Sequence, residues 1–295
     1  MQDCNFIYRA DDHSKILVGD IFIDEQGDTC TVQEVALSDD PQQTVYIDNW
    51  GNKHSFFDKV RWVKKQDTEG LVVITGVSTG IGHATARLFL EKGYKVVGIT
   101  NEPCDIVHPN FTHYEVDIRD KEHLPDLGEV AYVINNAGTD KKGEAMDTNV
   151  YGMFNIEDKY ITRATKSVVN LGSLTGHTGI EHREYTASKG AVLAYTKHLA
   201  KRVAPWGVRV NSISPGATIT PINDFILKSD DPQLYEDVSN ENLLKRWATP
   251  EEIAEMVYFV AVKATFSTAS DFVCDGGEIY NHTYITPIKD YTTIV

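Results

Sequence analysis

The hydrophobic pattern divides the chain into two parts with different periods. Up to residue 66, short β-rich runs alternate with acidic turns, namely Ile21–Ile23, Thr29–Leu37, Thr44–Ile47, His54–Phe57 and Val60–Val63. Short strands at this spacing without a helical period predict a small all-β domain over residues 1–66, either a curled sheet or an SH3-like barrel. The polar segment 66–70 is typical of a linker. We therefore predict a second domain over residues 67–280, followed by a C-terminal tail over 281–295.

After the linker the pattern changes to buried strand, glycine turn and helix. Leu71–Thr75 is a continuous apolar run, which is typical of a parallel strand buried on both faces. It leads into Gly76, Gly80 and Gly82, and a helical period then runs from residue 83 to 92. Glycines at such a turn let the backbone approach a pyrophosphate, and the helix N-terminus supplies amides and partial positive charge. The pattern predicts an α/β domain with a Rossmann-type, doubly wound parallel sheet that binds a dinucleotide.

A tyrosine and a lysine, Tyr185 and Lys189, lie four residues apart in a helix-forming run. This spacing places both side chains on one face of a helix. A free tyrosine has a pKa near 10, and a neighbouring positive charge lowers that pKa towards neutral pH. The pair therefore predicts a tyrosine general acid/base, although such pairs also occur by chance on solvated helices.

The order of motifs from residue 71 to about 280 resembles the classical short-chain dehydrogenase/reductase family. The matching elements are the glycine turn Thr75–Gly82, the run Asn135–Gly138, Asn149, Ser173, the pair Tyr185 and Lys189, the loop Pro215–Gly216 and the turn Asp275–Gly277. The resemblance implies a catalytic set of Asn149, Ser173, Tyr185 and Lys189. It also implies a cofactor site made of Gly76, Ser78, Thr79, Gly80, Ile81, Gly82, Thr100, Asn101, Asp117, Ile118, Asn136, Ala137, Gly138, Tyr185, Lys189, Pro215, Gly216, Thr218 and Thr220.

By this resemblance the protein transfers a hydride between nicotinamide and a small carbonyl or alcohol. Tyr185 would exchange a proton with the substrate oxygen, which Ser173 would hold. Lys189 would lower the tyrosine pKa and bind the nicotinamide ribose, and Asn149 would anchor a chain of water molecules. Asp117 would contact the adenine.

The choice between NAD and NADP stays open at this point. An acidic residue after the second strand selects NAD, and a basic residue there favours NADP. The chain has Thr100 and Asn101 at this place, followed by Glu102, which would repel a phosphate. The sequence thus favours NAD slightly.

Two crossovers differ from the family pattern, and neither the expected lid nor the loop before Tyr185 identifies the substrate. The segment 102–109 does not look helical, and only ten residues separate Gly138 from Asn149, so two crossovers are shortened. Of the four catalytic assignments, that of Asn149 is the one most affected by this shortening. We expect a lid over residues 219–246. His177, His182 and Arg183 lie between the catalytic serine and tyrosine, where they either contact substrate or belong to a solvated loop.

Composition and net charge limit the classes of molecule that the protein is expected to bind. The 295 residues are 41% hydrophobic and carry a formal net charge of −15, with an isoelectric point near 5.0, which argues against nucleic acid and anionic membranes. No apolar run approaches the roughly 20 residues of a membrane helix. The N-terminus has no signal-peptide pattern. Four scattered cysteines favour a reduced, cytoplasmic protein without a metal site. The resemblance implies a homodimer or homotetramer, and the tail 281–295 is apolar enough to pack on a neighbour.

Two functions from other classes are also compatible with a dinucleotide fold. One is a dinucleotide-binding regulator or scaffold, but Ser173, Tyr185 and Lys189 would be superfluous in such a protein. The other is a non-redox epimerase or dehydratase that keeps NAD bound. Substrate identity and reaction direction are not readable from the sequence.

Overall fold

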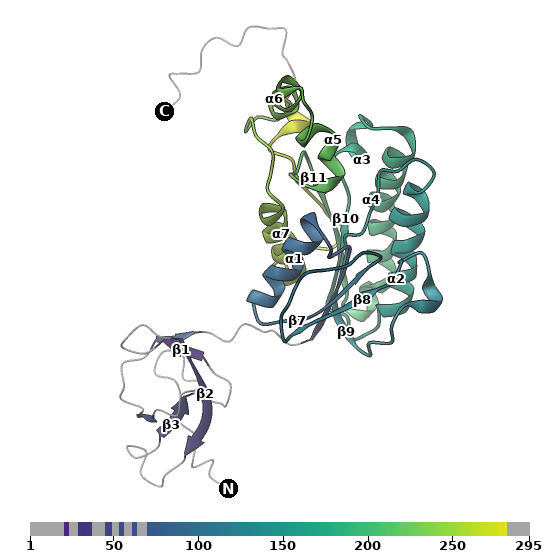
Figure 1. Ribbon diagram of the computed structural model, residues 1–295. Helices are drawn as coiled ribbons and strands as arrows, with labels where there is room; N and C mark the ends of the chain where they lie inside the picture. The colour runs from purple at the N-terminus through teal and green to yellow at the C-terminus, as the bar shows by residue number, and fades with distance from the viewer. Residues whose placement is uncertain are drawn as a thin grey trace. The chain divides into compact units, whose positions relative to one another are not determined.

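The computed structural model describes residues 70–281 continuously, and before them the backbone of five strands (Figure 1). The chain divides into two compact units, Met1–Thr68 and Glu69–Val295. In the first unit the strands pair antiparallel in the order β4-β3-β2-β1-β5. Their bounds are β1 Ile21–Ile23, β2 Thr29–Ala36, β3 Val45–Asp48, β4 Lys53–Ser55 and β5 Arg61–Val63. The residues between these strands and the tail from residue 282 lie outside the described residues, so the SH3-like barrel stays a prediction.

The second unit is built on a seven-stranded, wholly parallel sheet in the order β12-β11-β10-β9-β6-β7-β8. The chain passes from β6 outwards to β8, then returns to the other side of β6 and continues outwards from β9. Between β6 and β9 the order of strands reverses, and ligands of such sheets bind at the carboxyl ends of the strands there. The bounds are β6 Leu71–Thr75, β7 Lys95–Thr100, β8 Phe111–Glu115, β9 Val130–Asn135, β10 Ser167–Leu171, β11 Arg209–Pro215 and β12 Asp271–Cys274.

Helices cover both faces of this sheet, which confirms the predicted Rossmann-type α/β fold (Figure 1). Side chains alternate along each buried strand, so that Val72 and Ile74 pack with α1 and α7 while Val73 packs with α2 and α4. The helices are α1 Gly80–Glu91, α2 Met153–Tyr160, α3 Thr175–Thr178, α4 Arg183–Val203, α5 Asp224–Leu227, α6 Pro232–Asn240 and α7 Pro250–Tyr258. Short 3₁₀ turns are η2 Lys121–His123, η4 Ala204–Trp206, η5 Pro221–Asn223 and η7 Glu278–Tyr280, and π-helical turns are η3 Asp147–Gly152 and η6 Phe259–Lys263.

The two shortened crossovers take different forms. Residues 101–110 join β7 to β8 without a helix, as the sequence predicts. Pro103 and Pro109 each remove a backbone donor in this segment. As a result the edge strand β8 is only partly buried. The second crossover retains a helix. The π-helical turn η3 leads directly into α2.

A buried carboxyl group lies between α2 and the sheet. Glu157 is 4% exposed, and its Oε1 accepts a hydrogen bond of 3.1 Å from Asn135 Nδ2. The same amide nitrogen donates to Asn170 Oδ1 at 2.8 Å, and Asn170 Nδ2 donates to Thr196 Oγ1 at 3.1 Å. Burial raises the pKa of Glu157 to about 8, and hydrogen bonds to it oppose the rise. This carboxyl is therefore neutral in most folded molecules at pH 7.

Glu157→Gln should make the folded protein less sensitive to alkaline pH. In the wild type the unfolded carboxyl ionises above its ordinary pKa near 4.5, whereas the folded one keeps its proton up to about pH 8. The folded state thus binds the extra proton, and stability falls as pH rises through this window. A glutamine has no such proton to lose. Denaturant unfolding at pH 5 and pH 8 should show that the free energy of unfolding of the variant, relative to that of the wild type, is higher at pH 8 than at pH 5. For the exposed Glu91→Gln, the difference from the wild type should be the same at both pH values. Parallel pH profiles for Glu157→Gln and wild type would contradict the neutral carboxyl.

Candidate active site

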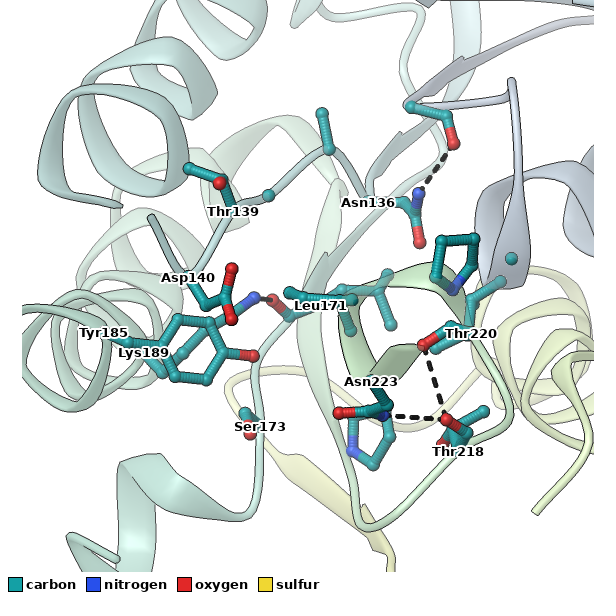
Figure 2. A pocket seen from close by; sticks show the side chains of 18 of the residues that line it. Asn136, Thr139, Asp140, Leu171, Ser173, Tyr185, Lys189, Thr218, Thr220 and Asn223 are labelled. Carbon is teal, nitrogen blue, oxygen red and sulfur yellow. Dashed lines mark hydrogen bonds between the residues drawn. The ribbon is translucent and has the colours of Figure 1, made fainter. Parts of the chain in front are cut away.

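One cavity of about 780 Å³ lies at the carboxyl ends of the central strands. Every residue predicted to bind the cofactor lines it except Gly82, and Ser173 lines it as well. Figure 2 shows side chains from the end of β9, from β10, from α4 and from the loop after β11 around this space. The predicted lid contributes Phe225 and Ile226 of α5 and Val238 of α6 to the wall. Segments far apart in the sequence therefore meet at the crevice that the strand order predicts.

The glycine turn after β6 has a backbone that larger residues would not fit. Gly76 has a φ of +70°, and a Cβ there would lie 2.9 Å from the Cα of Ala137. A Cβ on Gly82 would lie 2.1 Å from the carbonyl oxygen of Gly76. Gly82 thus allows α1 to pack against the turn, and it is not among the residues that line the cavity, so its role in cofactor binding stays a prediction.

A set of hydrogen bonds joins the ends of β6 and β9. Thr75 Oγ1 accepts from the backbone N–H groups of Asn136 and Ala137 at 3.0 and 2.9 Å. In return Asn136 Nδ2 donates to the carbonyl oxygens of Thr75 and Gly76 at 3.0 and 3.1 Å. Asn136 therefore uses its amide to hold the glycine turn in place, in addition to lining the cavity.

The residues at the start of α1 fit a dinucleotide pyrophosphate. The helix has 12 residues, no acidic residue in its first turn, and no side chain that caps its first amides. Gly80 opens it with a φ of +58° and lines the cavity with Ser78 and Thr79. Free amides and the positive end of the helix dipole favour an anion here. The cofactor predicted from the sequence is thus compatible with the residues present.

Two acidic side chains, Glu102 and Asp117, and the basic side chain of Arg119 line the end of the cavity beyond the glycine turn. Glu102 Oε2 accepts a hydrogen bond of 3.2 Å from Ser78 Oγ, so it lies directly over the turn. Asp117 is held by Arg119, whose Nη2 lies 2.6 Å from Asp117 Oδ2, and this bond lowers the pKa of the aspartate. Arg119 also lines the cavity, although the sequence did not single it out. The carboxylate of Asp117, which was predicted to contact the adenine, is thus paired with Arg119 in the structure.

The predicted reactive pair lies on α4, at the opposite end of the cavity. Tyr185 and Lys189 both line it, and the Lys189 Nζ is 5.7 Å from the centre of the tyrosine ring. Lys189 is 6% exposed, and its Nζ donates to the carbonyl oxygen of Leu171 at 2.9 Å (Figure 2). Burial lowers the pKa of Lys189 to about 8. The lysine is thus fixed to the end of β10.

The ionisation of the tyrosine differs from the expectation. Burial raises the pKa of Tyr185 to about 12, a hydrogen bond with Ser173 opposes this rise, and the carboxylates of Glu181 and Asp140 add to it. We expected the ammonium of Lys189 to lower this pKa. In the structure the desolvation of the phenol outweighs any such effect, because a phenolate inside the protein loses its hydration. Tyr185 is therefore a proton donor at neutral pH.

Asn149 reaches the site despite the shortened crossover, but it lies behind the cavity wall. It is 3% exposed and belongs to the π-helical turn η3. Its Oδ1 accepts from Thr139 N at 2.8 Å, and its Nδ2 donates to Thr139 O and to Ser188 Oγ, both at 2.9 Å. These bonds connect the segment after β9 to α4. The described contacts give Asn149 a positioning role beside Lys189.

The loop between Ser173 and Tyr185 contributes other residues than those expected. His177 Nε2 lies 2.8 Å from Asp271 Oδ2, and the side chain of His182 caps α4. Arg183 is largely exposed. None of the three predicted residues lines the cavity. Ile180 and Glu181 of the same loop do line it, as do Asp140, Glu241, Trp247 and Glu278. Nothing local in the sequence distinguishes these residues, because they come from separate segments.

The described part of the chain contains neither a metal-binding cluster nor a membrane-spanning helix. Within it, no group of three or more His, Cys, Asp or Glu side chains is placed to hold a metal ion. Among the same residues, no helix is both long and apolar enough to cross a bilayer. Cys104 and Cys274 are free thiols.

Comparison with known proteins agrees with this geometry. The sequence family described as "Enoyl-(Acyl carrier protein) reductase" matches residues 76–278. L-fucose dehydrogenase of Bos taurus is 30% identical over 244 residues, which cover 70% of this chain and 88% of that protein.

Solved structures show the same fold. The ligand-free aldohexose dehydrogenase of Thermoplasma acidophilum has a TM-score of 0.69 and 25% identity, covering 76% of this chain and 99% of its own. A 4-hydroxyisoleucine dehydrogenase complexed with NADH has a TM-score of 0.63 and 25% identity, covering 72% of this chain and 100% of its own. The ordered motifs, the parallel sheet and these matches together show that the chain belongs to the short-chain dehydrogenase/reductase family and is an NAD(P)-dependent oxidoreductase acting on CH–OH or C=O groups.

Proposed function

We propose that the protein interconverts a small alcohol and the corresponding carbonyl, with Tyr185 as the general acid/base. The observation that supports this most is the meeting of Ser173, Tyr185 and Lys189 at one end of a cavity whose other end fits a pyrophosphate. When bound, the nicotinamide dinucleotide supplies or accepts the hydride. The glycine turn, the start of α1 and the loop after β11 would hold it.

The two hydroxyl groups have complementary tasks in this scheme. Tyr185, whose pKa burial raises to about 12, holds its proton at neutral pH and donates it to the substrate oxygen in the reductive direction. In the oxidative direction Tyr185 would first have to release its own proton, and the phenolate would then remove the proton of the alcohol. Ser173 hydrogen-bonds to the same oxygen and stabilises the charge that develops on it.

Lys189 and Asn149 support the tyrosine from the protein side. With a pKa near 8, Lys189 carries its positive charge in most molecules at pH 7, at 5.7 Å from the tyrosine ring. That charge stabilises a transient phenolate. Asn149 fixes the segment at Thr139 and the helix at Ser188, between which Lys189 lies. The proposal retains the role of Lys189 as a ligand of the nicotinamide ribose.

NAD is the cofactor that Glu102 favours. Glu102 lies over the glycine turn, where Ser78 donates to it at 3.2 Å. A carboxylate at this place can accept from a ribose hydroxyl and repels a 2′-phosphate. Solved structures with this fold are described with either cofactor, a 4-hydroxyisoleucine dehydrogenase with NADH and ElxO with NADP, so the choice of NAD rests on Glu102 alone. The regulatory or scaffold function and the epimerase or dehydratase function have no observation in their favour.

Three broader expectations remain predictions alongside this function. They are a homodimer or homotetramer, a cytoplasmic location, and a small all-β module over residues 1–66 whose role is open. The domain bounds 67–280 and 281–295 have the same standing.

Tyr185→Phe should abolish most turnover and leave cofactor binding intact. The substitution removes only the hydroxyl that exchanges the proton, a contribution of about 10²- to 10⁴-fold for general acid/base catalysis. Steady-state assays of NADH absorbance with a panel of aldehydes, ketones and alcohols would measure it. Tyr151→Phe, on a tyrosine 56% exposed, is the matched control and should keep wild-type rates. Near-normal turnover by Tyr185→Phe would refute the scheme.

Glu102→Gln should lower the ratio of the affinity for NADH to the affinity for NADPH by about three- to tenfold. Removing the carboxylate removes its repulsion of the 2′-phosphate, an effect that stays moderate because the side chain is exposed and salt screens it. Titration of nicotinamide fluorescence with both reduced cofactors at low and high ionic strength would measure the ratio. Glu115→Gln, which changes the same charge at an exposed place outside the cavity lining, should leave the ratio as it is. An unchanged ratio in Glu102→Gln would remove Glu102 from cofactor selection.

A further inference from the structure

Four hydrogen-bonded side chains form a buried polar network that leads from α2 through β9 and β10 to α4. Glu157 Oε1 accepts from Asn135 Nδ2 at 3.1 Å, and the same nitrogen donates to Asn170 Oδ1 at 2.8 Å. An amide nitrogen has two N–H groups, so it can make both bonds at once. Asn170 Nδ2 donates in turn to Thr196 Oγ1 at 3.1 Å. Each of the four residues is at most 6% exposed, so water does not compete for these bonds.

The network ends on the strand and the helix that hold the reactive lysine. Asn170 directly precedes Leu171, whose carbonyl oxygen accepts from Lys189 Nζ at 2.9 Å. Thr196 follows Lys189 on α4 by two helical turns, so both side chains lie on the same face of the helix. Two successive residues of β10 are therefore bonded to one face of α4. A shift of α4 along the strand would break both contacts.

Glu157 fixes the orientation of the amides in the network. The two ends of an asparagine amide have nearly the same shape, and hydrogen bonds decide which end is which. Because Glu157 Oε1 accepts, Asn135 presents its nitrogen to Asn170, which is its register partner in the sheet. Asn170 then presents its own nitrogen to Thr196, whose hydroxyl donates to Val192 O at 2.8 Å. The direction of every bond thus follows from the acceptor at the start.

The network is uncharged at neutral pH. Burial raises the pKa of Glu157 to about 8, and the other titratable groups that act on this carboxyl are Tyr195 of α4 and Asp158 of α2. The remaining members are two amides and a hydroxyl. At pH 7 the network therefore acts on Lys189 through its position and not through a charge.

We propose that Glu157 is a positioning residue for the reaction: through the buried polar network it holds the end of β10 against α4 and keeps Lys189 on the carbonyl oxygen of Leu171. This assignment rests on the proposed function, in which the charge of Lys189 stabilises the phenolate of Tyr185. The bond from the ammonium to the carbonyl oxygen favours the charged lysine. Loosening that bond lowers the pKa of Lys189 further below its ordinary value, so the charge is lost at a lower pH.

Glu157→Leu and Thr196→Val break the network at its two ends, the second without changing any charge. In both, the alkaline limb of the kcat profile in the reductive direction should move about one pH unit lower, the equivalent of one lost buried hydrogen bond. At pH 9 kcat should then fall about tenfold, and less at pH 7. Glu157→Gln and Thr196→Ser keep the accepting oxygens and should restore the limb of the wild type.

Thr165→Val is the matched control for a merely structural effect. Thr165 is 3% exposed, and its hydroxyl donates to Val130 O at 2.9 Å, at the opposite end of β10 from Leu171. The substitution removes a buried hydroxyl and its bond, as Thr196→Val does. It should lower the midpoint of thermal unfolding and leave the alkaline limb in place. Thermal unfolding of every variant also shows that it is folded.

A measurement without turnover separates this inference from the proposed function. The pKa of Lys189 is read from the ε-carbon NMR shifts of isotope-labelled lysines, with the signal assigned by its absence in Lys189→Arg. A lower pKa in Glu157→Leu and Thr196→Val than in Thr165→Val supports the positioning role, even if no substrate is turned over and the proposed function fails. Turnover by the wild type with an unchanged pKa and limb in both network variants overturns the inference and leaves the function standing. An equal shift in Thr165→Val, or a shifted pKa with unchanged kcat, also overturns it.

Discussion

The site depends on the hydrogen bonds by which Thr75 and Asn136 hold the ends of β6 and β9 together. These two strands are neighbours in the sheet but belong to its two separate halves. Four hydrogen bonds of 2.9 to 3.1 Å fix the glycine turn of one half against the strand end of the other. Thr75 is 1% exposed, so these bonds are made where water does not compete. The pyrophosphate end and the reactive end of the cavity keep their relation because of this connection.

Burial controls the reactive groups more than their mutual attraction does. It raises the pKa of Tyr185 and lowers that of Lys189, so that each group tends towards its neutral form. The carbonyl oxygen of Leu171 holds the lysine, and Ser173 opposes the rise at the tyrosine. A site of this kind keeps its proton until a substrate oxygen arrives to receive it. The spacing of two residues on a helix shows that they meet, but their ionisation depends on everything packed around them.

The parallel sheet, the glycine turn and the pair Tyr185 and Lys189 were predicted from local patterns, whereas Ser173 was predicted only from the resemblance to the family. The missing helix after β7 was equally readable from Pro103 and Pro109. Trp247, Glu278 and Arg119 were not predicted, since their importance comes from contacts between segments that only the folded chain brings together. Gly82 was predicted to contact the cofactor because spacing alone does not distinguish such a glycine from one whose lack of a side chain serves the packing of α1.

The cavity is lined by both halves of the sheet, and this has a consequence for the lifetime of the protein. A ligand that binds only the folded chain stabilises it by about 2.7 kcal/mol when its concentration is a hundred times its dissociation constant. The residues predicted to bind the dinucleotide come from elements between β6 and β11, so the domain as a whole would gain that energy. The unfolded fraction would then fall about a hundredfold. Binding of the proposed cofactor would in this way couple the amount of folded protein to the supply of that cofactor.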